Sequence, residues 1–136
     1  MQHTVVVRVR HHEMDALGHV NNAVYLNYVE EAAIEHGRAL GYDEARWRSL
    51  GGNWVVRRHE IEYRAPAVAG DELTVTTRIV ALDRARGTRR TTIERDDTLL
   101  VEAVTEWVWI GLDGRPRRIP PDVLADFSGN EKGAPP

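Results

Sequence analysis

Cysteine is absent from the 136 residues of the chain. Without thiols the protein has no disulfide, no thiolate metal ligand and no cysteine nucleophile, so its chemistry must use oxygen or imidazole groups. Lysine occurs only at Lys132, and 18 basic residues face 21 acidic ones, which gives a formal net charge of -3. Nucleic-acid-binding proteins normally carry a basic excess, so this balance favours a small-molecule partner and no nucleic acid.

Long apolar runs are also absent. No stretch approaches the length of a membrane-spanning helix, and the first residues, MQHTVVVRVRHH, lack the apolar core of a secretory signal. We therefore expect a cytoplasmic protein with no membrane partner. The length fits one domain, large enough to bury a core.

The first half of the chain predicts one strand and one long helix. Valines alternate with other residues over 4–10, which is the period of a strand. Apolar residues recur with helical spacing from Ala23 to Leu40, where Asn21 or Asn22 can cap the start and Gly41 the end. We expect residues 11–20 to form a structured loop between the two.

The second half predicts a linker and four antiparallel strands. Residues 42–52 are the linker, with Trp47 and Leu50 folded back on the core. The expected strands are 54–64, 73–81, 88–95 and 99–110. The fold class is thus α+β, with a curved sheet around one helix. We assign 1–122 to a single domain and 123–136 to a polar, partly disordered tail. The last strand is apolar on both faces, which favours a homo-oligomer.

Three segments resemble a known family. The run VRVRHHEMDALGHVNNAVYLNYVEEAAIEHGRALG, followed by VVRRHEIEYRAPAVAGDELTV and GLDGRPRRIP, resembles the hotdog-fold acyl-CoA thioesterases of the 4-hydroxybenzoyl-CoA thioesterase type. The resemblance covers roughly residues 4 to 122, and DALGHVNNAVYLNYVEEA is its most specific part. It implies a five-stranded antiparallel sheet around the helix, and a homodimer or homotetramer with the active site at the dimer interface.

The same resemblance assigns roles to residues. The family's catalytic carboxylate falls on Asp15, its carbonyl-polarising backbone N–H falls near Asn22, and Tyr25 matches a tyrosine near the acyl pocket. Some relatives use a helix glutamate instead, and Glu30, Glu31 and Glu35 leave that variant open. The implied substrate is an acyl-CoA or acyl-carrier-protein thioester.

The residues themselves offer matching chemistry. The N–H groups at a helix start can stabilise the negative charge that builds on a thioester oxygen. Asp15, just ahead of the helix, can activate a water or attack the carbonyl itself, and the sequence does not separate these routes. His19 can polarise the substrate or orient Asp15, although a loop histidine is more often structural.

Other candidates have weaker signals. We add Gly18, Val20, Asn21 and Arg64 to Tyr25 as candidate substrate-binding residues. The histidines show no metal-ligand spacing, so we expect no metal and no cofactor. Candidates for the coenzyme A phosphates are the arginines of the predicted strands, namely Arg57, Arg58, Arg64, Arg89 and Arg90.

Two alternatives to a thioesterase stay open at this stage, and the sequence argues against a third. A non-catalytic domain of the same fold could bind or sense acyl-CoA, and a protein-binding dimer would need no ionisable group at the helix start. A hotdog dehydratase would have a histidine followed by proline-rich turns, but no proline precedes Pro66.

Overall fold

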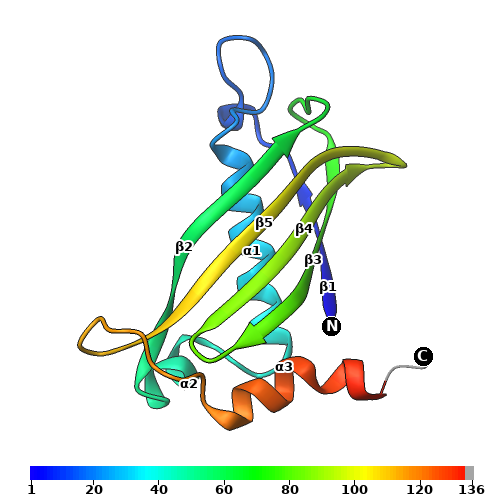
Figure 1. The fold of residues 1–136 in the computed structure, drawn as a ribbon. Coiled ribbons are helices and arrows are strands. Elements are labelled where there is room, and N and C mark those ends of the chain that lie inside the picture. The colour runs from blue at the N-terminus through cyan, green and yellow to red at the C-terminus, as the bar shows by residue number, and fades with distance from the viewer. Residues whose placement is uncertain (134–136) are drawn as a thin grey trace.

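The computed structural model describes the backbone of residues 1–133 and the side chains of residues 1–128. Five strands form one antiparallel sheet in the order β1-β3-β4-β5-β2, and α1 lies against one of its faces (Figure 1). The predicted α+β architecture is confirmed. The elements are β1 (Gln2–Arg8), the short 3-10 helix η1 (His11–Glu13), α1 (Val24–Ala39), α2 (Glu44–Ser49), β2 (Gly52–Tyr63), β3 (Glu72–Asp83), β4 (Arg86–Arg95), β5 (Thr98–Gly111) and α3 (Pro121–Gly133).

Helix α1 is the centre of the core. Its buried side includes Tyr25, Val29 and Ala32, which pack with residues of the sheet, and its main neighbours are β1 and β3. Gly41 follows the helix with φ +88°, a left-handed conformation that glycine adopts without strain, as the sequence predicts. The buried stripe also contains His36, which the apolar pattern did not include.

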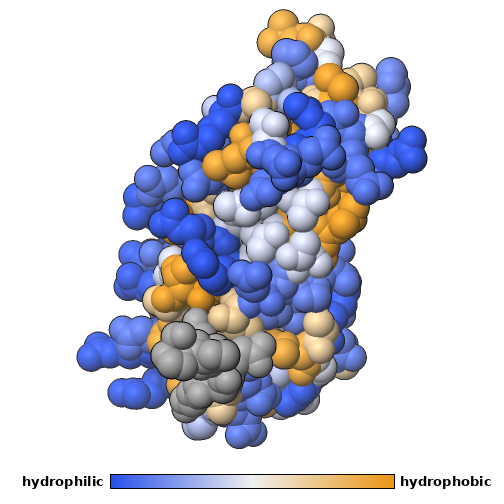
Figure 2. All heavy atoms as spheres, turned by 90° about the vertical axis from the view of Figure 1, so that its right-hand side faces the viewer, coloured by the Kyte–Doolittle hydropathy of each residue, from blue (hydrophilic) through white to orange (hydrophobic). Residues whose placement is uncertain are grey.

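The face in Figure 2, the side of the molecule seen on the right of Figure 1, is largely hydrophilic and has only separated apolar spots. Such scattered apolar residues are normal for a water-facing surface.

The predicted linker between the helix and the second strand is wrong in part, because it contains α2. The Asp43 side chain caps this helix by accepting a hydrogen bond of 2.8 Å from the Arg46 N–H. Trp47 stacks on Tyr42 with ring centroids 4.6 Å apart. Trp47 and Leu50 also pack against a buried cluster formed by Tyr42, Ile79, Trp109, Ile119, Val123 and Phe127. The predicted inward folding of Trp47 and Leu50 is thus confirmed.

The C-terminal segment also differs from the predicted polar tail, since residues 121–133 form α3. Val123 and Phe127 lie four residues apart on this helix and are buried. The Tyr42 hydroxyl donates a 2.5 Å hydrogen bond to Asp126. These contacts cover the end of the core where α2 also lies. The rest of the predicted tail, 134–136, is outside the described residues.

Arg89, His36 and Thr77 form a buried polar cluster. Arg89 of β4 donates from the same terminal nitrogen to Nδ1 of His36, at 2.9 Å, and to the Thr77 hydroxyl, at 3.2 Å. Burial, and then the Arg89 charge, lowers the pKa of His36 to about 4. His36 is therefore neutral at pH 7 and accepts the hydrogen bond from Arg89.

Truncation of Phe127 tests the packing of α3. Phe127→Ala removes a buried ring, so we expect the free energy of unfolding in urea to fall by about 3 kcal/mol. Asp122→Asn, on an exposed position of the same helix, should change it by less than about 0.5 kcal/mol. Equal urea midpoints for wild type and Phe127→Ala would show that α3 is not packed on the core.

The His36 cluster predicts a pH dependence of stability. An ordinary histidine has a pKa of 6.5, so the unfolded chain takes up this proton first, and the folded state loses stability as the pH falls from 6.5 toward 4. The loss from this group should be on the order of 3 kcal/mol. His36→Gln keeps an acceptor for Arg89 but does not titrate. Its unfolding free energy, measured between pH 7 and 4, should therefore fall less than that of wild type; parallel curves would contradict the assignment.

Candidate active site

The loop before α1 is a small hairpin. Met14 and Val20 pair as an isolated β-bridge, and the Asp15 N–H donates a 2.8 Å hydrogen bond to the His19 carbonyl. The Gly18 N–H closes the turn on the Asp15 carbonyl at 3.0 Å, and Gly18 has φ +77°. A side chain at this φ would be strained, which explains glycine at this position. The hairpin therefore gives the Asp15 backbone a defined conformation.

The Asp15 carboxylate has one oxygen engaged and one available. Oδ1 accepts a 2.9 Å hydrogen bond from the Leu17 N–H, while Oδ2 has no hydrogen-bond partner within the described part of the chain. The residue is only partly exposed. Asp15 is thus oriented by its own turn and retains a free lone pair for a water or substrate.

The backbone N–H of Asn22, at the start of α1, is open. The Asn21 N–H donates to the Glu13 carbonyl at 2.9 Å, and the Ala23 N–H donates to Asn21 Oδ1 at 2.9 Å. Between them, the N–H of Asn22 donates no hydrogen bond within residues 1–133. Asn21 therefore provides the predicted side-chain bond, although Ala23 is the N-cap residue and makes no side-chain cap itself. The N–H of Asn22 is available to an external oxygen.

Residues at the end of β2 and in the loop after it, from the second segment that resembles the family, hold the start of α1 in place. The Val20 N–H donates to the Ala67 carbonyl at 2.9 Å, and the Ala67 N–H donates to the Tyr25 hydroxyl at 3.1 Å. The Tyr63 hydroxyl donates to the Asn22 carbonyl at 2.8 Å. Tyr63 and Ala67 thus connect the end of β2 and the following loop to the helix start. Val20 is buried and Tyr25 is 3% exposed, so both support the site from inside.

Sequence reasoning missed Glu13 and Tyr28 as supporting residues. Glu13 is only 6% exposed, and its carboxylate accepts a hydrogen bond of 2.9 Å from the Tyr28 hydroxyl. It also accepts from the Arg10 backbone N–H at 2.8 Å and the Arg10 guanidinium at 3.0 Å. A glutamate three residues after Arg10, in a loop rich in charge, gave no sign of burial.

The remaining predicted residues are less closely connected. His19 is exposed, and its side chain makes no hydrogen bond to Asp15. The Arg64 guanidinium donates to Glu102 at 2.6 Å and to Glu62 at 3.1 Å. A role for either side chain at the substrate stays a prediction. Among the arginines considered for coenzyme A phosphates, Arg89 is buried and faces the core, so the expectation that it is an exposed phosphate ligand is wrong.

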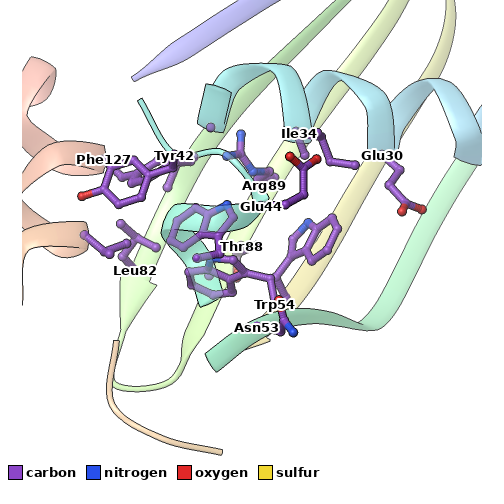
Figure 3. A pocket seen from close by; sticks show the side chains of 17 residues that line it. Glu30, Ile34, Tyr42, Glu44, Asn53, Trp54, Leu82, Thr88, Arg89 and Phe127 are labelled. Atoms are coloured by element: carbon purple, nitrogen blue, oxygen red, sulfur yellow. The ribbon is translucent and has the colours of Figure 1, made fainter. Parts of the chain in front are cut away.

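A cavity of about 230 Å³ lies farther along α1. Figure 3 shows Glu30 and Ile34 projecting from α1 and Asn53 and Trp54 projecting from β2, with Phe127 of α3 at one end. Most of the lining is apolar or aromatic, and Arg89 is an exception to it. Such concave apolar spaces with few polar groups are typical of small-molecule sites.

Two further observations concern the described residues as a whole. They contain no group of three or more His, Asp or Glu side chains arranged to hold a metal ion. None of their helices is both long and apolar enough to cross a membrane.

Comparison with known proteins identifies the family. Residues 9–127 match the family model described as thioesterase-like superfamily. The chain is 32% identical to the acyl-CoA thioester hydrolase YbgC of Escherichia coli over 126 residues, covering 89% of this chain and 92% of YbgC. It is 30% identical to the acyl-acyl carrier protein thioesterase ATL2 of Arabidopsis thaliana over 127 residues, covering 92% of this chain and 68% of ATL2.

A solved structure supports the same relationship. The thioesterase of Thermus thermophilus, determined with coenzyme A and zinc, superposes with a TM-score of 0.84 at 31% identity, covering 98% of this chain and 96% of that one. The hotdog architecture predicted from the sequence is confirmed by this match and by the sheet order. The chain belongs to the thioesterase-like superfamily.

Proposed function

We propose that the protein hydrolyses acyl-CoA or acyl-carrier-protein thioesters to a free acid and a thiol. The main support is the unpaired N–H of Asn22 at the start of α1, beside a hairpin that holds the Asp15 carboxylate. Relatives named as acyl-CoA hydrolases and as an acyl-carrier-protein thioesterase support both kinds of thiol carrier.

In the proposed mechanism, the thioester oxygen accepts a hydrogen bond from the Asn22 N–H. Negative charge builds on this oxygen as the carbonyl carbon is attacked, and the positive end of α1 stabilises it. One such donor is typically worth about 3 to 4 kcal/mol in the transition state. Asp15 either removes a proton from the attacking water or attacks the carbonyl to form a mixed anhydride. When water attacks, the tetrahedral intermediate expels the thiolate as the C–S bond breaks, and the thiolate takes the proton held by Asp15. When Asp15 attacks, the C–S bond breaks as the mixed anhydride forms, and water then hydrolyses the anhydride to the free acid and the Asp15 carboxylate, with the released proton going to the thiolate.

We also propose that the protein acts as a homodimer or homotetramer. Strand β2 lies at one edge of the sheet and exposes Val55 and Val56, at 40% and 36%. An edge strand with unpaired backbone groups and exposed apolar residues is suited to pairing with a second chain.

Replacement of Asp15 tests the proposed carboxylate. Asp15→Asn keeps the side-chain shape and removes the charge, so we expect kcat to fall by about 100-fold or more on the best substrate of an aliphatic and aromatic acyl-CoA panel. Thiol release measures the rate, and the melting temperature should stay unchanged.

Asp97→Asn is the matched control, because Asp97 lies in the exposed turn between β4 and β5. Equal activity of wild type and Asp15→Asn would contradict the role of Asp15 and favour a helix glutamate, first Glu30, which lines the cavity. If wild type binds acyl-CoA but releases no thiol, the protein is a non-catalytic binding domain.

Tyr63 is proposed as a positioning residue. Tyr63→Phe removes the 2.8 Å hydrogen bond to the Asn22 carbonyl and leaves the helix start less constrained. We expect kcat to fall roughly tenfold with little change in KM, because the N–H of Asn22 acts mainly in the transition state. Tyr63 is 46% exposed, so the free energy of unfolding should fall by only about 1 kcal/mol or less. A rise in KM at constant kcat would instead assign Tyr63 to substrate binding.

A further inference from the structure

The cavity beside α1 contains a buried positive charge that no carboxylate neutralises. Arg89 is 9% exposed, and its only hydrogen bonds within the described residues go to His36 and Thr77. Thr77 is uncharged, and His36 is neutral at pH 7 because burial and the Arg89 charge lower its pKa to about 4. Burial also lowers the pKa of Arg89 to about 10, which still leaves the guanidinium charged at neutral pH.

Two carboxylates line the same cavity without pairing with Arg89. Glu44 accepts a 2.6 Å hydrogen bond from Arg38 instead. Glu30 is exposed on α1, and no ion pair joins it to Arg89. Buried charges are normally paired, so the unpaired guanidinium is unusual and points to an anionic partner from outside the chain.

Arg89 also has donors to spare. Only one of its terminal nitrogens donates to His36 and Thr77, so the other N–H groups of its guanidinium have no acceptor within the described part of the chain. Because Arg89 lines the cavity, these N–H groups are available to a ligand there.

We propose that this cavity binds a small carboxylate with an apolar body, whose oxygens accept hydrogen bonds from the Arg89 guanidinium. Arginine is well suited to this role because its planar fork matches the geometry of a carboxylate. The apolar body would lie against the aromatic lining from Trp47, Trp54 and Phe127.

The volume of the cavity fits a small ligand, and the two carboxylates at its wall favour a carboxylate ligand over a phosphate. Its volume of about 230 Å³ is below the range typical of drug-sized ligands, which fits a small acid. Glu30 and Glu44 would repel a doubly charged anion more strongly than a singly charged one. The carboxylate could be the far end of the acyl group of a thioester substrate or a free acid, and only the first source depends on the proposed hydrolase function.

Binding of free acids tests the site directly. We would titrate 3-phenylpropionate and its neutral amide, 3-phenylpropionamide, into the full-length protein by calorimetry. Wild type should bind the acid at least tenfold more tightly than the amide. Arg89→Met should weaken acid binding at least tenfold. Arg78→Met is the matched control, because Arg78 is an exposed arginine on the neighbouring strand β3; it should bind the acid like wild type.

Arg89→Lys is the second variant, in case Arg89→Met does not fold. Lysine keeps the positive charge but lacks the planar guanidinium. This variant should show the melting temperature of wild type and intermediate acid affinity. Equal affinity of wild type for acid and amide, or equal acid affinity in wild type and a folded Arg89 variant, would overturn the proposal.

A second arm distinguishes the two sources of the carboxylate. Thiol release would be compared for hexanoyl-CoA and for the same six-carbon chain ending in a carboxylate. A preference for the carboxylate chain in kcat/KM that Arg89→Met removes assigns the site to the acyl group. Arg89-dependent acid binding with no such preference assigns it to a free acid. If neither thioester is hydrolysed but the acid still binds through Arg89, the hydrolase function fails and the binding site stands.

Discussion

The buried carboxylate of Glu13 joins the parts of the molecule that form the candidate active site. It lies in η1, just after β1, and accepts hydrogen bonds from Arg10 and from Tyr28 of α1. Burial by itself raises the pKa of Glu13, but hydrogen bonds from Arg10 and Tyr28 outweigh it and hold the pKa below the usual value. Its carbonyl also accepts from Asn21. Glu13 therefore connects η1, the residue after the hairpin at Asn21, and α1.

This anchoring explains how an exposed hairpin can hold a defined geometry. A loop with only its own turn to order it would open locally at low cost in free energy. Here detaching Glu13 from α1 would break the hydrogen bond from the Tyr28 hydroxyl to its buried carboxylate, and a hydrogen bond to a charged group contributes about 1.5 to 3 kcal/mol. The preorganisation that a hydrogen-bond donor such as the Asn22 N–H needs in catalysis thus comes from residues that do not touch the substrate.

Much of the fold was predictable from the sequence because its signals are local. Valine alternation and the apolar face between Ala23 and Leu40 report burial directly, and both elements lie within a few residues of their predicted bounds. Helix α2 was missed because it has six residues and no buried side chain, so it leaves no periodic pattern. Helix α3 was missed because Val123 and Phe127, the buried residues of its part with described side chains, stand among polar ones.

The sequence predicted the candidate site only for residues that lie within the segment resembling the family. Asp15, Asn22 and Tyr25 lie in one signature segment, but Tyr63 and Ala67 reach the helix start from more than 40 positions away. Nothing in the sequence indicates that Arg89 faces the core while Arg90 faces outward, because strand parity alone does not say which face is buried. That assignment needed the register of β4 against β3 and β5.

Glu13 and Arg89 present the same physical problem with opposite outcomes. Each is a charged group removed from water, and Glu13 receives a charged partner and neutral donors from its own chain. Within the described residues Arg89 receives only two neutral acceptors, although Glu30 and Glu44 border the same cavity. An unpaired buried charge lowers the stability of the fold, and a partner supplied from outside would restore it. The contrast separates a carboxylate that holds the fold together from a guanidinium whose missing partner is best explained by a ligand.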